Sequence, residues 1–408
     1  HTAIQSLQIF FEMDPEEPDV NESFVLTCLP TVINNVLNCM TAQELNVCAR
    51  VCKCWCSAVH VIKEKRQQRN LFTWLSVEVG DENDTPTWIN QIQDFFKSQY
   101  SEPAMLLMFC QSTLVTLQVK VPARSQSNRP RRATKFEKLE FKDFVQSLLP
   151  NTCKFIGIAT DGVIGTSSNL EKIQEVEGEK FMSLLCIPRI KGVDILTESA
   201  DITEKDNIIT TFIPKEKAVK TILFFCDDPR CPPQIGNTLR ENYEGAVIAG
   251  GSIDCHISPD LSCGDGIDLD DELRPIYVSC VAFCGENLHC ASIVLEHSTH
   301  TQQEIEEKIL KLKGCGLPEE KSFAFMFACT ARGKAFHQKE NVESSIFKKH
   351  FPKTPLFGFF GNGEIGFTHL PDAGNAKLHL KMEEGQSKKR LSKLHHSYST
   401  VFCLLSIM

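Results

Sequence analysis

Apolar residues near the start of the chain recur with the period of a helix. Four of them occupy positions i, i+3, i+4 and i+7 and so share one face of a short helix: Ile33, Val36, Leu37 and Met40. A second helix is predicted from Ala42 to Val59, because Thr41 and Glu44 have the spacing of a capping box. The charged residues 60–70 are predicted to form a helix that leads into the next domain.

The helix predicted over residues 42–59 has little polar surface. Twelve of its eighteen residues are apolar, and most of its polar residues form one narrow stripe: Asn46, Arg50, Lys53 and Ser57. A bundle of about 45 residues cannot bury so much apolar surface alone. The pattern predicts a permanent helical partner, and the alternative is an ordinary hairpin that its own chain buries.

After residue 71 the pattern becomes that of strands. Several runs are apolar on both faces, which predicts central strands covered on both sides: residues 105–110, 155–159, 181–187, 219–226 and 246–249. Further strands are predicted at residues 276–284, 289–297, 323–329, 356–360, 377–382 and 398–407. The turns Gly285–Asn287 and Asn362-Gly363 predict two antiparallel hairpins, with positive φ in the second. Helices are predicted at residues 301–313, with a Thr301/Glu304 capping box and an apolar Ile305/Ile309/Leu312 stripe, and at residues 341–350. The fold class is α+β, with large mixed sheets packed against helices.

A chain of 408 residues is long enough for two or three domains. Residues 1–21 are acidic and contain proline, which predicts a disordered leader. We expect a helical module at 22–70 and a two-part body at 71–245 and 246–408. The basic segment 120–135 is predicted to be a solvated loop, with a regulatory or nuclear-import role as an alternative.

Composition excludes several classes of function. The chain is 42% hydrophobic and 23% charged, which is typical of soluble globular proteins, and its net charge of -9 argues against nucleic-acid binding. It has no apolar run near 18 residues and no signal peptide, so neither membrane insertion nor secretion is expected. Nineteen cysteines in such a chain are expected to be free thiols and small buried side chains.

The N-terminal helices resemble an F-box, the module that docks a ubiquitin-ligase substrate receptor onto a Skp1-type adaptor. The resemblance rests on Leu29-Pro30, Val36-Leu37, Leu45 and the run from Val51 to Trp55, although Val32 replaces an acidic residue of the family pattern. It implies a cullin scaffold and RING subunit as partners through the adaptor. It also implies these adaptor contacts: Leu29, Pro30, Val36, Leu37, Leu45, Val51 and Trp55.

The body resembles FIST domains, which are regarded as sensory or ligand-binding modules. Phe325–Gly333, Pro355–Gly366 and His396–Tyr398 are similar to the C-terminal half of that family, and residues 154–165 and 247–254 to its N-terminal half. Together the resemblances imply a non-catalytic, cytoplasmic and nuclear receptor whose body holds a protein substrate. A module that senses a small ligand is the alternative.

Four residues of the FIST-like motifs are predicted to contact the substrate or ligand, because both motifs must lie close together to form one site: Cys329, Arg332, Asn362 and Glu364. Cys329 ends a strand-like run near Arg332, whose charge would lower the thiol pKa. An inert core cysteine is the other interpretation. A hydrolase with Cys329 as nucleophile is the enzyme alternative, and it needs a base such as His337, His350 or His396.

No metal or cofactor is predicted. Four thiols near the first helices would leave one helix in different directions and so cannot converge on one ion: Cys48, Cys52, Cys54 and Cys56. The acidic residues 265–272 lack the spacing of a calcium-binding EF-hand, and the glycine-rich residues 357–366 precede a strand rather than the helix of a phosphate-binding loop. His395 and His396 would point to opposite faces of a strand.

Overall fold

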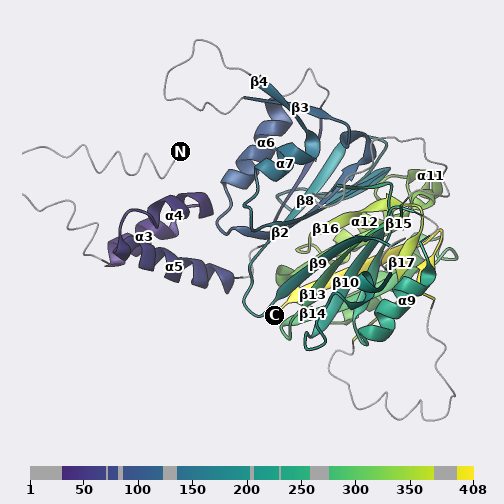
Figure 1. The fold of residues 1–408 in the computed structure, drawn as a ribbon. Coiled ribbons are helices and arrows are strands. Elements are labelled where there is room, and N and C mark those ends of the chain that lie inside the picture. Colours follow the sequence, from purple (N-terminus) through teal and green to yellow (C-terminus); the bar gives the residue numbers. More distant parts are fainter. Residues whose placement is uncertain are drawn as a thin grey trace, which may run out of the picture.

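The computed structural model describes residues 30–69, 72–80, 86–122, 136–202, 206–228, 231–257, 275–371 and 393–408. Several predictions therefore lie outside the described residues: the acidic leader, Leu29, most of the basic segment 120–135, the acidic run 265–272 and the strand at 377–382. Three helices form an N-terminal module beside a β-rich body (Figure 1): α3 (Pro30–Asn38), α4 (Ala42–Cys48) and α5 (Lys53–Gln67).

The start of α4 confirms the predicted capping box. The Thr41 hydroxyl accepts from the Glu44 amide at 3.3 Å, and the Glu44 carboxylate accepts from the Thr41 amide at 2.8 Å. The prediction of one helix from Ala42 to Val59 is wrong, because the chain turns at residues 49–52 and Cys52 is extended. A straight helix cannot pack against itself, and the turn lets α5 fold back over α3 and α4 so that their apolar faces bury one another.

Three mixed sheets make up most of the body. The first sheet contains, in spatial order, β1 (Thr73–Glu78), β8 (Phe181–Pro188), β2 (Pro103–Gln111), β5 (Lys154–Thr160) and β12 (Cys255–Ile257). The second contains β9 (Asp194–Asp201), β13 (Tyr277–Cys284), β10 (Val219–Cys226), β11 (Val247–Ser252), β17 (Glu364–Gly366) and β18 (His395–His396). The third contains β14 (Leu288–Leu295), β19 (Thr400–Ile407), β15 (Ser322–Cys329), β16 (Leu356–Gly361), β6 (Gly162–Thr166) and β7 (Ile173–Glu177). A separate two-stranded ribbon pairs β3 (Gln118–Pro122) with β4 (Phe136–Glu140).

The three sheets repeat one topology. Each has an edge strand, an antiparallel neighbour and then a parallel pair, which is β2 with β5, β10 with β11, or β15 with β16. After each parallel pair the chain passes into another sheet, from β5 to β6, from β11 to β12 and from β16 to β17. The body is thus three interlocked units. The boundary that we predict after residue 245 falls between β10 and β11, which are neighbours in the second sheet.

Both predicted hairpins are wrong. Residues 285–287 connect β13 in the second sheet to β14 in the third, and residues 362–363 connect β16 in the third sheet to β17 in the second. Each strand instead pairs with a strand distant in sequence, such as β14 with β19. The expected positive φ is present, since Gly363 has a φ of 130°. A tight turn with positive φ can therefore join facing sheets as well as adjacent strands.

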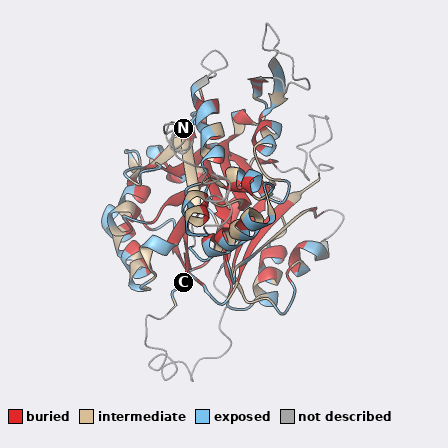
Figure 2. Ribbon diagram, turned by 90° about the vertical axis from the view of Figure 1, so that its left-hand side faces the viewer, coloured by how far each residue is buried: buried red, intermediate tan, exposed pale blue. Residues whose placement is uncertain are grey.

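Phenylalanine side chains fill the space where the three sheets face one another. Phe109 of the first sheet, Phe225 of the second and Phe327 of the third share one buried cluster. Their rings pack at the distances of aromatic pairs, with the Phe225 and Phe327 centroids 5.8 Å apart. Strands β2, β10 and β15 are buried along most of their length, and Figure 2 shows buried strands at the centre of the body, which confirms the prediction of strands covered on both faces.

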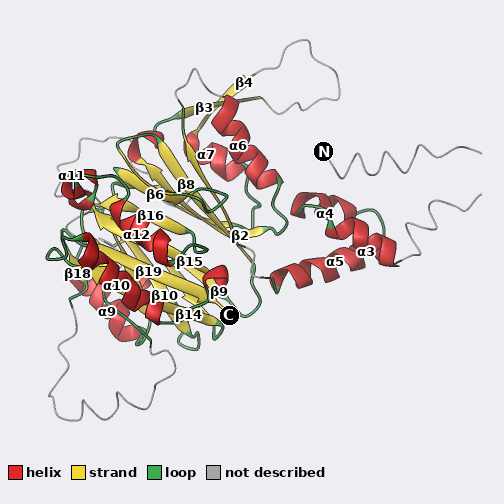
Figure 3. Cartoon of the chain, turned by 180° about the vertical axis from the view of Figure 1, so that it is seen from behind, coloured by secondary structure: helices red, strands yellow, loops and turns green. Residues whose placement is uncertain are grey.

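Pairs of helices cover the outward face of each sheet (Figure 3). The first sheet packs against α6 (Pro86–Lys97) and α7 (Phe141–Ser147). The second packs against α8 (Asp206–Thr211) and α9 (Pro233–Asn242), and the third against α10 (Gln302–Gly314) and α12 (Val342–His350). The predicted stripe of α10 is confirmed, since Ile305, Ile309 and Leu312 are buried and the Thr301/Glu304 capping box is present.

Candidate functional sites: the helical module and the strand ends of the body

The helical module has a small core of its own. Its buried apolar residues come from all three helices: Ile33, Leu37, Leu45, Cys48, Val59 and Ile62. Two predicted adaptor contacts, Leu37 and Leu45, are therefore enclosed by their own chain. Of the other predicted contacts that the structure describes, Pro30 and Val51 are exposed, and Val36 and Trp55 are half-buried.

Large apolar side chains remain uncovered on this module. Val47 is 66% exposed and Val51 is 63% exposed, and Val61 on α5 is also exposed. Val51 is among the predicted adaptor contacts, whereas Val47 and Val61 are not. Val47 is, however, one of the twelve apolar residues that we counted in residues 42–59. A contiguous patch of exposed apolar side chains marks an interaction site, so these residues are candidates for one.

Arg66 joins the module to the body. This nearly buried side chain, near the end of α5, donates from Nη2 to the carbonyls of Asn38 at 3.2 Å and Met40 at 2.8 Å, and from Nη1 to the carbonyl of Tyr100. Its guanidinium also lies over the Tyr100 ring, 5.4 Å from the centroid. Burial lowers the Arg66 pKa, and the carbonyl acceptors compensate the charge. This forked donor is thus one of the contacts that orient the module on the body, together with the Ala42 amide, which donates to the Gln99 carbonyl at 2.7 Å.

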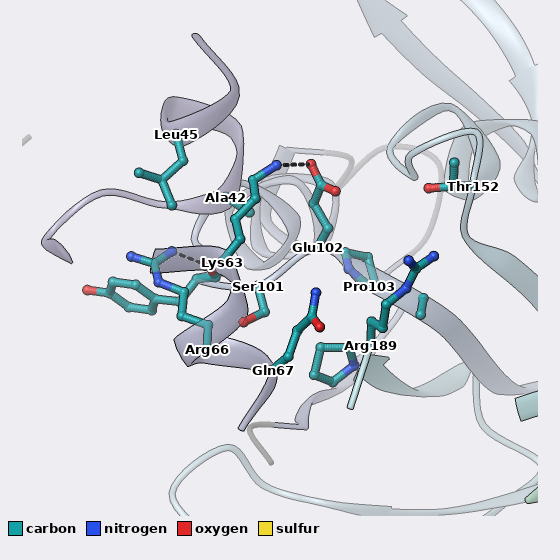
Figure 4. A pocket seen from close by; sticks show the side chains of 13 residues that line it. Ala42, Leu45, Lys63, Arg66, Gln67, Ser101, Glu102, Pro103, Thr152 and Arg189 are labelled. Atoms are coloured by element: carbon teal, nitrogen blue, oxygen red, sulfur yellow. Dashed lines mark hydrogen bonds and ion pairs between the residues drawn. The ribbon is translucent and has the colours of Figure 1, made fainter. Parts of the chain in front are cut away.

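A cavity of about 250 Å³ lies at this junction. Figure 4 shows Lys63 of the module and Glu102 of the body pointing toward one another, and their charged groups are 3.6 Å apart. The cavity is lined from both sides by residues such as Leu45, Gln67, Pro103 and Arg189. It marks where the module and the body meet.

A second candidate site lies at the end of β15 and the start of β17. Cys329 is the last residue of β15, Glu364 is the first of β17, and Asn362 lies in the turn before Glu364. Oε2 of Glu364 accepts from the Ser399 amide at 3.0 Å and the Ser399 hydroxyl at 2.7 Å. Oε1 is buried and accepts from no nitrogen or oxygen donor among the residues that the structure describes, and the Cys329 thiol is a weak donor to the carboxylate. Burial raises the pKa of Glu364 to about 7.

The Cys329 thiol is not activated. Burial and the neighbouring Glu364 carboxylate both raise its pKa, and these effects outweigh the backbone amides of Ala331 and Tyr398, which lower it. The prediction that Arg332 lowers the pKa of this thiol is therefore wrong. The structure favours the other interpretation, a cysteine that is largely buried and protonated.

Arg332 is turned inward, toward Glu343. Its Nε and Nη2 both donate to Oε1 of Glu343, at 2.9 and 2.6 Å. Nη2 also donates to the carbonyl of Thr299, and Nη1 donates to the carbonyls of Glu296 and Tyr398. All donors of the guanidinium are thus used within the chain. The structure brings Cys329, Asn362 and Glu364 together. The Arg332 side chain instead connects separate loops by hydrogen bonds to their carbonyls.

The three candidate bases for a cysteine hydrolase have other partners. Nε2 lies 3.1 Å from Glu343 in His337, 2.6 Å from Glu306 in His350, and 2.9 Å from the Gly366 carbonyl in His396. Because the pKa of the Cys329 thiol is raised as well, the geometry gives no support to a nucleophile and base pair. Within the described ranges, no group of three or more potential metal ligands converges, and no helix is long and apolar enough to cross a membrane.

Comparison with known proteins assigns the two parts of the chain. Residues 26–67 match the model of the F-box domain, and residues 268–367 match that of the FIST C domain. The helical module thus matches an F-box, and part of the body matches a FIST C domain.

Among individual proteins, the chain is similar to F-box only protein 22. It is 28% identical to the protein of Homo sapiens and 27% identical to that of Pongo abelii, in each case over 95% of both chains. An F-box/LRR-repeat protein of Arabidopsis thaliana is 37% identical over 21% of this chain and 14% of its own length. A solved cyanuric acid hydrolase from A. caulinodans aligns over 83% of this chain and 99% of its own, with 6% identity and a TM-score of 0.33, too low to indicate a shared activity.

Proposed function

We propose that this chain is the substrate-recognition subunit of a Skp1-cullin-F-box ubiquitin ligase. The observation that carries the proposal is an F-box whose own chain leaves Val47 and Val51 largely exposed. A Skp1-type adaptor would cover these side chains and connect the chain to the cullin scaffold and its RING subunit. The FIST body would bind the protein to be ubiquitinated for proteasomal degradation. The complex would act by proximity, with no catalytic residue from this chain.

The proposed adaptor surface combines exposed and supporting residues. Pro30, Val36, Val51 and Trp55 would contact the adaptor directly, together with Leu29 and Val47. Leu37 and Leu45 would act from inside, because their burial fixes the positions of α3 and α4. An apolar centre is typical of stable protein interfaces, and these side chains would supply it.

Binding to a purified Skp1-type adaptor tests the proposal. Val51→Asp places a charge where an apolar contact is expected, so calorimetry should show a loss of adaptor affinity of about 100-fold or more. Since Val51 is solvent-exposed, the thermal stability of the free chain should hardly change. Leu310→Asp is the matched control, because Leu310 is also exposed but lies on α10 in the body. Failure of the wild-type chain to bind the adaptor, or equal binding by Val51→Asp, would refute the proposal.

A second candidate function is the sensing of a small ligand by the FIST body. The buried Glu364 carboxylate favours it, because besides Ser399 its one donor among the described residues is the weakly donating Cys329 thiol. A ligand that donates to Oε1 would therefore add stability. Thermal shifts of the full chain with a metabolite library would test it. A stabilising compound should lose its effect on Glu364→Gln, and an effect that persists there would place the compound elsewhere.

We also propose that the chain works in the cytoplasm and nucleus. Sixteen cysteines of the described part are free thiols, as in reducing compartments, although Cys255 is disulfide-bonded. Fluorescence microscopy of the tagged chain in intact cells tests this assignment, and accumulation in a secretory compartment would contradict it.

A further inference from the structure

Four rings from three separate segments form a row near one end of the third sheet. The centroids are 5.4 Å apart between Tyr398 and His297, 5.6 Å between His297 and His300, and 5.7 Å between His300 and Phe336. We call these four residues the aromatic row. Tyr398, His297 and His300 are exposed, and Phe336 is half-buried.

The aromatic row lies far from the helical module. Phe336 belongs to α11 (Lys334–His337), which is on the opposite side of the body from α3, α4 and α5 in Figures 1 and 3. A partner on the aromatic row would therefore leave the proposed adaptor surface free. This is the arrangement that a receptor with two simultaneous partners requires.

One buried side chain holds the whole row in place. Arg332 donates to the carbonyls of Glu296 and Thr299, the residues just before His297 and His300, and to the carbonyl of Tyr398 itself. Its guanidinium also lies 5.0 Å from the centroid of Phe336. Arg332 thus contacts two residues of the row, Tyr398 and Phe336, and the residues that directly precede the other two. Such a common support indicates a preorganised surface rather than a chance grouping of rings.

The backbone at Tyr398 is strained. Its φ is 58°, in the left-handed region that residues other than glycine and asparagine rarely adopt. The next residue fixes this conformation, since Ser399 donates to Glu364 and its carbonyl accepts from the Cys329 amide at 2.9 Å. The Tyr398 ring on this strained backbone is 55% exposed, so the strained conformation does not serve to pack the ring into a core. Backbone strain that persists at an exposed side chain indicates a role in binding.

The chemistry of the row favours an uncharged partner. The nearby cations are compensated within the chain, since Arg332 pairs with Glu343 and Lys334 with Glu340. The rings offer flat apolar faces, and the Tyr398 hydroxyl and the imidazole N–H groups offer hydrogen-bond donors at their edges. A polyproline II segment matches both features, because its proline rings are flat and its backbone carbonyls are free to accept.

We infer that the aromatic row binds an extended, proline-containing segment of a partner protein. The inference rests on the proposed function only for the role of that partner as the ubiquitinated substrate. Peptide binding to the row does not need the adaptor. A negative result here therefore leaves the adaptor experiment with Val51→Asp unaffected, and the two proposals can fail separately.

Peptide selection against the full chain tests the inference. One library displays peptides of about ten residues with proline at every third position and random residues between, and the other is equally random but free of proline. The proline library should yield binders, which are then measured as synthetic peptides by fluorescence anisotropy. Recovery of binders from the proline-free library alone, or of mainly acidic or basic peptides, would overturn the inference.

Variants locate the binding. Tyr398→Asn removes the ring and keeps a residue that tolerates left-handed φ, so the fold should persist and affinity should fall at least about tenfold. Tyr100→Asn is the matched control, because Tyr100 is also 55% exposed but lies beside the helical module, and it should leave affinity unchanged. His300→Ala provides a second test within the row and should also weaken binding. Equal affinity of the wild type and both row variants would overturn the inference.

Discussion

Arg332 and Glu343 form an ion pair that is closed to solvent. Nη2 of Arg332 lies 2.6 Å from Oε1 of Glu343, and each side chain is 1% exposed. His337 lies on the same oxygen, with its Nε2 3.1 Å from Oε1 of Glu343, so Arg332 and His337 together compensate this buried carboxylate. Burial alone would raise the Glu343 pKa, but the hydrogen bond with His337 and the charge of Arg332 keep it below its usual value.

Removing one member of this pair should destabilise the body strongly. Arg332→Met leaves the Glu343 carboxylate buried without a cation, so we expect a loss of about 3–5 kcal/mol in the free energy of unfolding. Adding Glu343→Leu to that variant removes the uncompensated charge and should restore part of the loss. Urea unfolding of both variants measures the difference. A single variant that loses less than about 1 kcal/mol would contradict this account of the pair.

Arg66 should control how firmly the helical module is attached. Arg66→Lys keeps the charge but cannot donate in a fork to the carbonyls of Met40 and Tyr100. We expect faster hydrogen exchange and faster proteolysis at residues 30–69, with little change in the sheets of the body. Arg69→Lys is the control, since Arg69 is exposed nearby. Equal protection of residues 30–69 in the two variants would show that the attachment does not depend on Arg66.

Local patterns were sufficient to predict most elements but not their partners. The strand β10 has the bounds that its apolar run predicts, and α10 has the predicted cap and stripe, because both depend on neighbouring residues. The strands with which β13 and β14 pair could not be predicted in this way. Both strands are apolar on both faces, and such a pattern identifies a central strand without indicating its sheet.

The candidate sites show the same limit. Two motifs predicted that Cys329 and Glu364 lie together, because both motifs must be close to form one site. The direction of the Arg332 side chain could not be predicted, because its acceptors are carbonyls of distant loops. The aromatic row was missed for a related reason. Its rings come from three segments, and no local signal indicates the left-handed conformation of Tyr398.

Glu364 should make stability depend on pH. Burial raises its pKa to about 7 in the folded chain, while the unfolded chain keeps the usual value near 4.5. The folded state therefore binds the proton more tightly, so the stabilisation is complete below about pH 4.5 and is lost as pH rises through about 7. Glu364→Gln cannot ionise and lacks this dependence.

The difference between the wild type and Glu364→Gln isolates this effect. From pH 4.5 to pH 8, the free energy of unfolding of the wild type should fall relative to the variant by roughly 3 kcal/mol at most. Urea unfolding at a series of pH values measures both curves, and the subtraction removes other titrating groups. A constant difference across this range would mean that Glu364 does not titrate as its burial implies.

Gly358 is a position where the parallel pair of β15 and β16 tolerates no side chain. Its φ is 145°, and a Cβ atom there would lie 1.9 Å from the carbonyl oxygen of Met326 on β15. The strand cannot move away, because β6 pairs with the other edge of β16. Gly358→Ala should therefore cost about 4 kcal/mol or more, through both backbone strain and the clash.

Gly245→Ala separates strain from clash. Gly245 also has a positive φ, 83°, but no atom lies within 4 Å of the position of its Cβ. It should lose only the 1–2 kcal/mol, roughly, that a left-handed conformation costs an alanine. Denaturant unfolding and the yield of soluble chain compare the two variants. If the free energy of unfolding falls equally in both variants, the close contact with Met326 is not what requires glycine at position 358. The parallel pair of β15 and β16 would then be able to move apart to accommodate a side chain.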